Sequence, residues 1–251
     1  MINNHQDIEE SFRNKRKLGF GTLQLVPFRD ISAIVSKVSR KEFDQSAIDK
    51  NVKDIRWLSE AASKHEEVND FVNQHMTPLP LKLCTVFQSE SKVVQMLKKN
   101  YARFSLSLEE LDGKVEFGVS AKMLTRLTDE EIFKEKRHTL IRKIKSASPG
   151  RAYFLKKNLI DQVSEERNKK ASTLASSLYE DLRKISERSL LNPPVALESA
   201  KSKMILNAAF LVSREKTKRF LQKFRLLKAN YENSSLSFRL TGPWPPYNFV
   251  H

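Results

Sequence analysis

The sequence predicts an α+β protein of two domains, each with a small, mainly antiparallel sheet and packed helices. Apolar residues alternate with polar ones between Val115 and Met123, as in a strand with one buried face. Residues 79–87 and 204–212 are short, continuous apolar runs that favour buried strands. Other segments carry apolar residues three and four positions apart, which is typical of amphipathic helices. Strands and helices mixed in this way favour the α+β class.

The first domain is expected over residues 1–110. Residues 22–38 predict two short strands around a turn, because Pro27 and Asp30 interrupt β-branched and apolar residues. A helix is expected to follow and to end before Pro78. Its predicted buried face consists of Ile48, Val52, Ile55, Leu58 and Ala62, and the pattern continues less regularly through Val68, Phe71 and Val72.

The run LPLKLCTVF, residues 79–87, is the third strand expected in this domain. Ser89 can cap the helix that follows, in which apolar residues keep helical spacing up to Leu111. Gly113 suits the left-handed residue that closes many helices. The predicted order is therefore strand, strand, helix, strand, helix.

The second domain, residues 111–251, is expected to carry a long helical insertion over about 128–190. Thr128 and Glu131 form a capping-box pattern for a helix that should run to about Lys145. Ser148-Pro149 predicts another helix start, and helical spacing then continues in one long helix or two in tandem. The remaining expected elements are a strand over 204–212, a helix over 213–231 and a last strand with Leu236, Phe238 and Leu240 on one face.

The chain carries a formal net charge of +15, with 39% hydrophobic and 30% charged residues. This balance is typical of a globular protein with long exposed helices. No apolar run reaches the roughly 18 to 20 residues that span a bilayer, and the start lacks the apolar core of a signal peptide. We therefore expect a cytoplasmic protein. The single cysteine, Cys84, excludes an internal disulfide and favours a small buried side chain.

The sequence lacks the patterns of an enzyme. The segment GFG, residues 19–21, has none of the further glycines of a dinucleotide-binding or phosphate-binding loop. The segment HEE, residues 65–67, lacks the second histidine of a zinc-binding helix. We expect no catalytic residue, cofactor, metal ion or small-molecule substrate.

The segment SPGRAYF, residues 148–154, allows two interpretations. Arg151 could clamp an anion in a substrate loop. We favour a capped helix start whose Tyr153 and Phe154 pack inward, because it explains the same residues without a further site.

The helix expected over 214–230 has one apolar side and one strongly basic side. The positive electrostatic field of such a basic side attracts acidic proteins, anionic surfaces and nucleic acid. The stacking aromatics and reading motifs of nucleic-acid binders are missing, so we favour an acidic protein partner or a merely solvated face. The candidate interaction residues are Arg214, Lys218, Arg219 and Arg225.

The segment TGPWPPYNF, residues 241–249, directly continues the last expected strand. Residues before proline are held in extended conformations, so this segment loses little entropy on docking. Pro243 and Pro246 also match the bare PxxP pattern of SH3 ligands. We favour a docked tail in which Trp244 and Phe249 cover the end of the second core, because the strand before it is well patterned.

Four segments together resemble the gas vesicle protein F and L family: PLPLKLCTVF before a helix, DGKVEFGV, SPGRAYF opening a long helix, and the strand ending LTGPWPPYNF. The resemblance extends from about residue 22 to the end of the chain. The family usually has glycine where this chain has Cys84, and its members commonly begin with a strand of the type YLYGI. The motif residues are Pro149, Gly150, Gly242, Pro243, Trp244, Pro245, Pro246, Tyr247 and Phe249.

The resemblance implies a non-enzymatic accessory or minor structural protein of gas vesicle assembly. It implies two domains of ferredoxin-like layout with an added helical part. The implied partners are the hydrophobic shell protein and other accessory proteins. Binding of nucleic acid or of an anionic surface is the alternative function, motivated by the charge. The resemblance does not separate F-type from L-type members.

Overall fold

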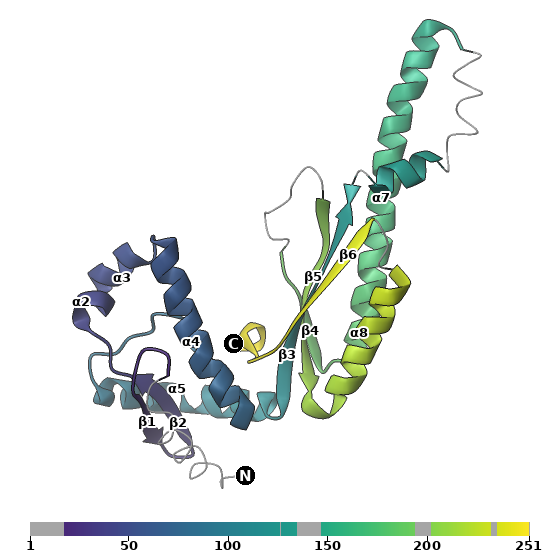
Figure 1. Ribbon diagram of the computed structural model, residues 1–251. Coiled ribbons are helices and arrows are strands. Elements are labelled where there is room, and N and C mark those ends of the chain that lie inside the picture. Colours follow the sequence, from purple (N-terminus) through teal and green to yellow (C-terminus); the bar gives the residue numbers. More distant parts are fainter. Residues whose placement is uncertain (1–17, 126, 135–146, 194–201, 232–234, 251) are drawn as a thin grey trace. The chain divides into compact units, whose positions relative to one another are not determined.

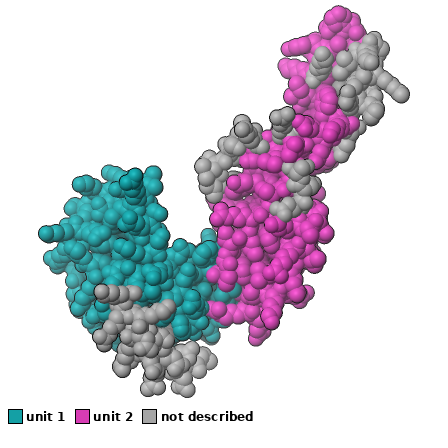
Figure 2. Space-filling model, in the orientation of Figure 1, with its two compact units in different colours: residues 1–115, 244–251 teal, residues 116–243 magenta. Residues whose placement is uncertain are grey.

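The computed structural model describes residues 18–125, 127–134, 147–193, 202–231 and 235–250 (Figure 1). The chain divides into two compact units (Figure 2). Unit 1 comprises Met1–Val115 with Trp244–His251, and unit 2 comprises Glu116–Pro243. The sequence placed the boundary near residue 110 and the tail in the second domain, whereas here the tail groups with unit 1. That each unit folds as an independent domain stays a prediction.

In unit 1, strands β1 (Leu23–Phe28) and β2 (Ile31–Ser36) form an antiparallel hairpin in which Leu23 lies opposite Ser36. The prediction of two short strands around a turn is confirmed. Helix α5 (Glu90–Leu111) packs against both strands, as its predicted apolar side requires. The core between them contains Val26, Ile31, Val93, Leu97 and Phe104.

The single helix expected before Pro78 is broken. Helices α2 (Arg40–Phe43), α3 (Gln45–Asn51) and α4 (Ile55–His75) occupy this region. Asp54 ends the α3–α4 connection, because its Oδ1 accepts hydrogen bonds from the N–H groups of Arg56 at 2.9 Å and Trp57 at 3.5 Å.

The predicted buried face of this helix is wrong in its central part. Val52, Ile55 and Leu58 are exposed, and Ile55 is 82% exposed. Ala61 is buried on α4 instead, whereas the buried Phe71 and Val72 agree with the predicted continuation of the pattern. The break at Asp54 starts a new helix, so the face of the first segment does not continue into the second.

The strand predicted over residues 79–87 is also wrong, because this segment forms a loop. Pro78 and Pro80 offer no backbone N–H for a sheet, and Thr85 N–H donates to Lys82 O at 3.1 Å to close a turn. Cys84, in this turn, has a positive φ of 64°.

Unit 2 contains a four-stranded sheet in the order β4-β5-β3-β6. Its strands are β3 (Lys114–Leu124), β4 (Arg188–Leu191), β5 (Ser202–Ser213) and β6 (Leu236–Trp244). The alternation predicted in β3 is confirmed, since all five apolar residues from Val115 to Met123 are buried. Strand β4, which pairs antiparallel with β5, was not predicted. With the hairpin of unit 1, this sheet confirms the α+β class.

Two helices cover the sheet of unit 2. Helix α7 (Pro149–Arg183) is one continuous helix of 35 residues that begins at the predicted Ser148-Pro149 start. Helix α8 (Thr217–Tyr231) follows the short 3-10 helix η1 (Arg214–Lys216). Both pack against β5 and against each other.

The first part of the predicted helical insertion is described only in residues 127–134, which are helical. The capping role of Thr128 is wrong, because its Oγ1 donates to Leu124 O at 3.0 Å instead of accepting from a following N–H. The expected continuation to about Lys145 lies outside the described residues.

Candidate functional site

Helix α8 carries the candidate basic surface, and its opposite side fixes it to the sheet. Phe220, Phe224 and Leu227 are buried, and Phe220 is fully enclosed. The Phe220 ring stacks on Phe117 of β3 at 5.1 Å and contacts Phe210 of β5 at 5.6 Å. This aromatic cluster holds the outer face of α8 in a defined orientation.

Two cations of η1 and α8 form ion pairs within unit 2. Lys216 forms an ion pair with Glu187 at 2.6 Å, and Lys223 forms one with Asp181 at 2.9 Å. These two cations link the helix to its own unit. The candidate interaction residues Arg214, Lys218, Arg219 and Arg225 are all exposed. We call these four residues the α8 basic face.

The proline-rich tail is docked along part of its length. Pro245 and Pro246 are fully buried, and Phe249 is 2% exposed. The 3-10 helix η2 (Tyr247–Phe249) is closed by Phe249 N–H, which donates to Pro246 O at 3.1 Å. Burial of Pro246 removes it from any SH3-type groove. Trp244, half-buried, and the more exposed Tyr247 complete the segment.

The tail does not group with the core that the sequence assigned to it. Residues Trp244–His251 belong to unit 1, although β6, which they continue, belongs to unit 2 up to Pro243. Gly242, at the end of β6, has a positive φ of 104°, a conformation that side chains disfavour. Periodicity in β6 predicted the strand but contains no information about where the chain leads after it.

At the start of α7, the predicted inward packing of the aromatic residues is wrong. Pro149 and Gly150 open the helix as expected and are exposed. Tyr153 and Phe154, expected to pack inward, are 65% and 70% exposed. Arg151 is exposed as well, and nothing in the described part of the chain places it in a pocket.

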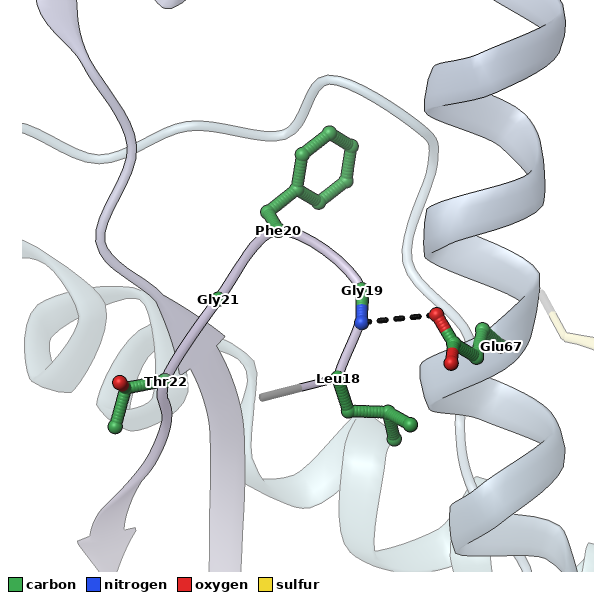
Figure 3. Close-up of a pocket in the computed structure, with 6 residues that line it drawn as sticks. All are labelled: Leu18, Gly19, Phe20, Gly21, Thr22 and Glu67. Carbon is green, nitrogen blue, oxygen red and sulfur yellow. Dashed lines mark hydrogen bonds between the residues drawn. The ribbon is translucent and has the colours of Figure 1, made fainter. Parts of the chain in front are cut away.

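A hollow in unit 1 is lined by Leu18–Thr22 and Glu67 of α4 (Figure 3). The Glu67 carboxylate accepts a hydrogen bond from Gly19 N–H at 3.0 Å. A Cβ at Gly19 would lie 2.6 Å from Val68 Cγ2 and 2.8 Å from Lys64 O, so only glycine fits here. The contact therefore holds residues 18–22 on α4, and Glu67 is engaged in it.

Burial causes the shifted pKa values of two groups in unit 1, His65 and Cys84. Burial lowers the pKa of His65, whose Nε2 contacts Leu81 O at 3.1 Å and so ties the loop to α4. Burial raises the pKa of the Cys84 thiol, which favours the protonated, less nucleophilic form. Over the described ranges, no three His, Cys, Asp or Glu side chains gather as metal ligands would. No described helix has the length and apolar character needed to cross a membrane.

The family described as gas vesicle synthesis protein GvpL/GvpF matches residues 5–251 of this chain. A gas vesicle protein L from Streptomyces sp. (strain CB03234) is 29% identical over 230 residues, which are 90% of this chain and 82% of that protein. A gas vesicle protein F1 from Halobacterium salinarum is 22% identical over 225 residues, covering 90% of this chain and 79% of the relative.

Two solved structures have a similar fold. Gas vesicle protein GvpF from Anabaena sp. PCC7120 matches with a TM-score of 0.70 at 16% identity, over 91% of this chain and 88% of that chain. GvpF from Microcystis aeruginosa matches with a TM-score of 0.64, also at 16% identity, over 92% of this chain and 89% of the other. At such low identity the likeness shows the fold alone.

Proposed function

The chain belongs to the GvpL/GvpF family of gas vesicle synthesis proteins, and from this we propose that it assists gas vesicle assembly in the cytoplasm by binding the shell protein and other accessory proteins. The match over residues 5–251 carries the proposal, because it includes both units and the motif segments. The family is one of gas vesicle proteins and not of enzymes.

The proposed mechanism is protection of an aggregation-prone subunit. A hydrophobic shell protein with exposed apolar surface and unpaired strand edges would aggregate before it joins the growing wall. A folded, charged partner that covers such an edge keeps the subunit available for assembly. The outer position of β6 in the four-stranded sheet supports this mechanism, because an edge strand can add a strand from another chain.

The α8 basic face supports the second half of the proposal, binding of acidic accessory proteins. Its cations are exposed, and Lys218, Arg219 and Arg225 project from a helix that the Phe220 cluster fixes. A field of one sign on a rigid surface accelerates encounter with partners of opposite charge.

Strand order supports a ferredoxin-like layout for unit 2. Apart from the helical segment 127–134, its elements run strand, helix, strand, strand, helix, strand, as in that fold, and its sheet order is β4-β5-β3-β6. The sheet of unit 1 has two strands among the described residues, so we extend the inference to unit 2 alone.

Co-expression with the shell protein of the same vesicle tests the central claim. We expect a larger soluble fraction of shell protein and its co-purification with this chain. An unchanged soluble fraction together with no co-purification would contradict the proposal.

Charge reversal tests the role of the α8 basic face. The triple variant Lys218→Glu, Arg219→Glu, Arg225→Glu should lose co-purification of acidic accessory proteins. The matched control changes the same charge on the exposed side of α5, with Lys92→Glu, Lys98→Glu and Lys99→Glu. Equal loss in both variants would assign the effect to net charge. A gel shift with nucleic acid that weakens steeply with salt in the wild type would favour the alternative function.

A further inference from the structure

The first turns of α7 lie outside any hydrophobic core. From Pro149 to Asn158, each side chain that the structure describes is exposed or half-buried. The rings of Tyr153 and Phe154 contact each other edge to face at 6.0 Å between centroids, and both face water. Ile160, about two turns after Tyr153, is 69% exposed. Large apolar side chains grouped in this way on a folded protein mark an interaction site.

These three side chains lie on one side of the helix. Residues seven positions apart, such as Tyr153 and Ile160, share a face two turns apart, and Phe154 flanks them. The opposite side is covered, because Leu159 and Val163 pack on Ile132 of the helical segment 127–134. We call Tyr153, Phe154 and Ile160 the α7 aromatic face.

The helical conformation of residues 149–158 also favours a partner on its exposed side. The C-terminal part of α7 packs on β5 and α8, but the helix continues well beyond the sheet (Figure 1). Most helix stability in proteins comes from packing of an apolar side, and the apolar side chains of the α7 aromatic face are largely exposed. Packing on the α7 aromatic face would supply this stabilisation.

Cations outnumber acids around the α7 aromatic face. Residues three or four positions apart are neighbours on a helix. At these spacings from the three apolar residues Arg151 and Lys157 both occur and are exposed, and one exposed acid, Asp161, lies on the same side, seven positions after Phe154. Neither cation forms an ion pair within the described part of the chain. The aromatic face therefore has a cationic rim.

We propose that the α7 aromatic face docks an acidic amphipathic helix of a partner protein, with its apolar stripe on Tyr153, Phe154 and Ile160 and its carboxylates on Arg151 and Lys157. The inference rests on the proposed assembly function, because it names the chemistry of one accessory partner. A second copy of this chain fits less well, since it would bring two chains of charge +15 and their cationic rims together.

A peptide titration with the full-length protein tests this inference. The probe is a synthetic, fluorescent amphipathic helix with Leu at its core positions and Glu beside them, and its control has Lys in place of every Glu. We expect saturable binding of the Glu peptide by fluorescence anisotropy, weakened by added salt, and no binding of the Lys peptide. The variant Tyr153→Ser, Phe154→Ser should weaken binding at least tenfold.

Matched variants separate docking from folding. Both substituted rings are exposed, so the double variant should keep the thermal midpoint of the wild type. Leu226→Ser removes an apolar side chain of similar exposure, 61%, from α8 and should leave peptide affinity unchanged. Equal binding of the Glu and Lys peptides, or wild-type affinity in the double variant, would overturn the proposal.

Three further outcomes are informative. A concentration-dependent dimer in sedimentation that disappears in the double variant would assign the face to a second copy and overturn the acidic partner. If the peptide fails to bind while co-expression still raises the soluble fraction of the shell protein, this inference is lost and the proposed function stands. Peptide binding without any effect on the shell protein would support this inference and contradict the proposed function.

Discussion

Tyr101 of α5 donates a hydrogen bond to Oδ1 of Asp30, in the turn between β1 and β2, across 2.5 Å. Arg29, beside Asp30, lies over the Tyr101 ring at 4.6 Å from its centroid. The hydrogen bond is the main cause of two opposite shifts: it lowers the pKa of Asp30 and raises the pKa of Tyr101. The hairpin turn is thereby attached to a helix far along the sequence.

Tyr101→Phe should therefore lower the stability of unit 1 in a pH-dependent way. The contribution of Asp30 is present above its unfolded pKa of about 4 and is lost as pH falls through its lower folded value. The contribution of Tyr101 is present below its unfolded pKa of about 10 and is lost as pH rises through its higher folded value. Urea midpoints of variant and wild type should differ at neutral pH and converge at both extremes.

Tyr153→Phe is the matched control, because it removes the same hydroxyl from an exposed ring. Its urea midpoint should follow that of the wild type at every pH. No gap between Tyr101→Phe and wild type at any pH would mean that ring packing, which Phe retains, attaches the turn without the hydrogen bond.

Cys84→Gly should stabilise the protein. The φ of 64° at Cys84 is a left-handed conformation that costs a residue with a Cβ about 1 kcal/mol or more and costs glycine almost nothing. The greater freedom of glycine in the unfolded chain offsets part of the gain, so we expect a net increase of about 0.5 to 1 kcal/mol in the free energy of unfolding. Lys82→Gly, in the same turn at an ordinary φ, should not stabilise. A lower urea midpoint for Cys84→Gly would contradict the explanation.

Gly118→Ala should destabilise unit 2 through one contact. A Cβ at Gly118 of β3 would lie 2.5 Å from Thr241 Oγ1 of β6. Overpacking of this kind costs about 1 to 3 kcal/mol. Thr241→Ala removes the obstructing oxygen, so the double variant should be more stable than Gly118→Ala alone. Additive effects in a double-mutant cycle would show that the two positions do not oppose each other.

Strands with one buried face were predictable because their periodicity records burial directly. Alternation from Val115 to Met123 and the apolar run of β5 predicted the two central strands of the unit 2 sheet. The run 79–87 has the same apolar character, yet a loop that packs Leu79 and Phe87 against a core also needs apolar residues. Two prolines in and before this run were the signal against a strand.

The candidate site could be predicted in residue type but not in arrangement. Cations on α8 were evident from the sequence, whereas the use of Lys216 and Lys223 in ion pairs depends on Glu187 and Asp181, which lie on other elements. Helical spacing likewise identifies the apolar residues at the start of α7 but not what covers them. The exposure of Tyr153 and Phe154 follows only from the absence of a packed element on that side in the described structure.

Phe249→Ala tests the unit to which the tail belongs. Phe249 is 2% exposed, and truncation of a buried Phe to Ala costs about 3 to 5 kcal/mol. Since residues Trp244–His251 group with unit 1, we expect the loss of protection in hydrogen exchange to appear in α4, α5 and the β1–β2 hairpin. Tyr247→Ala, at a more exposed ring of the same segment, should have a smaller effect.

The pattern of hydrogen exchange also shows which core the tail stabilises. If protection fell in β3 and β5 while α4 and α5 kept theirs, the tail would belong to the core of unit 2, as the sequence suggested. If Phe249→Ala changed protection in neither unit, the buried position of Phe249 would contribute no stability, and the segment would be available as a ligand for another protein. Loss confined to unit 1 would instead mean that the C-terminal motif stabilises unit 1, although β6, which the motif continues, belongs to unit 2 up to Pro243.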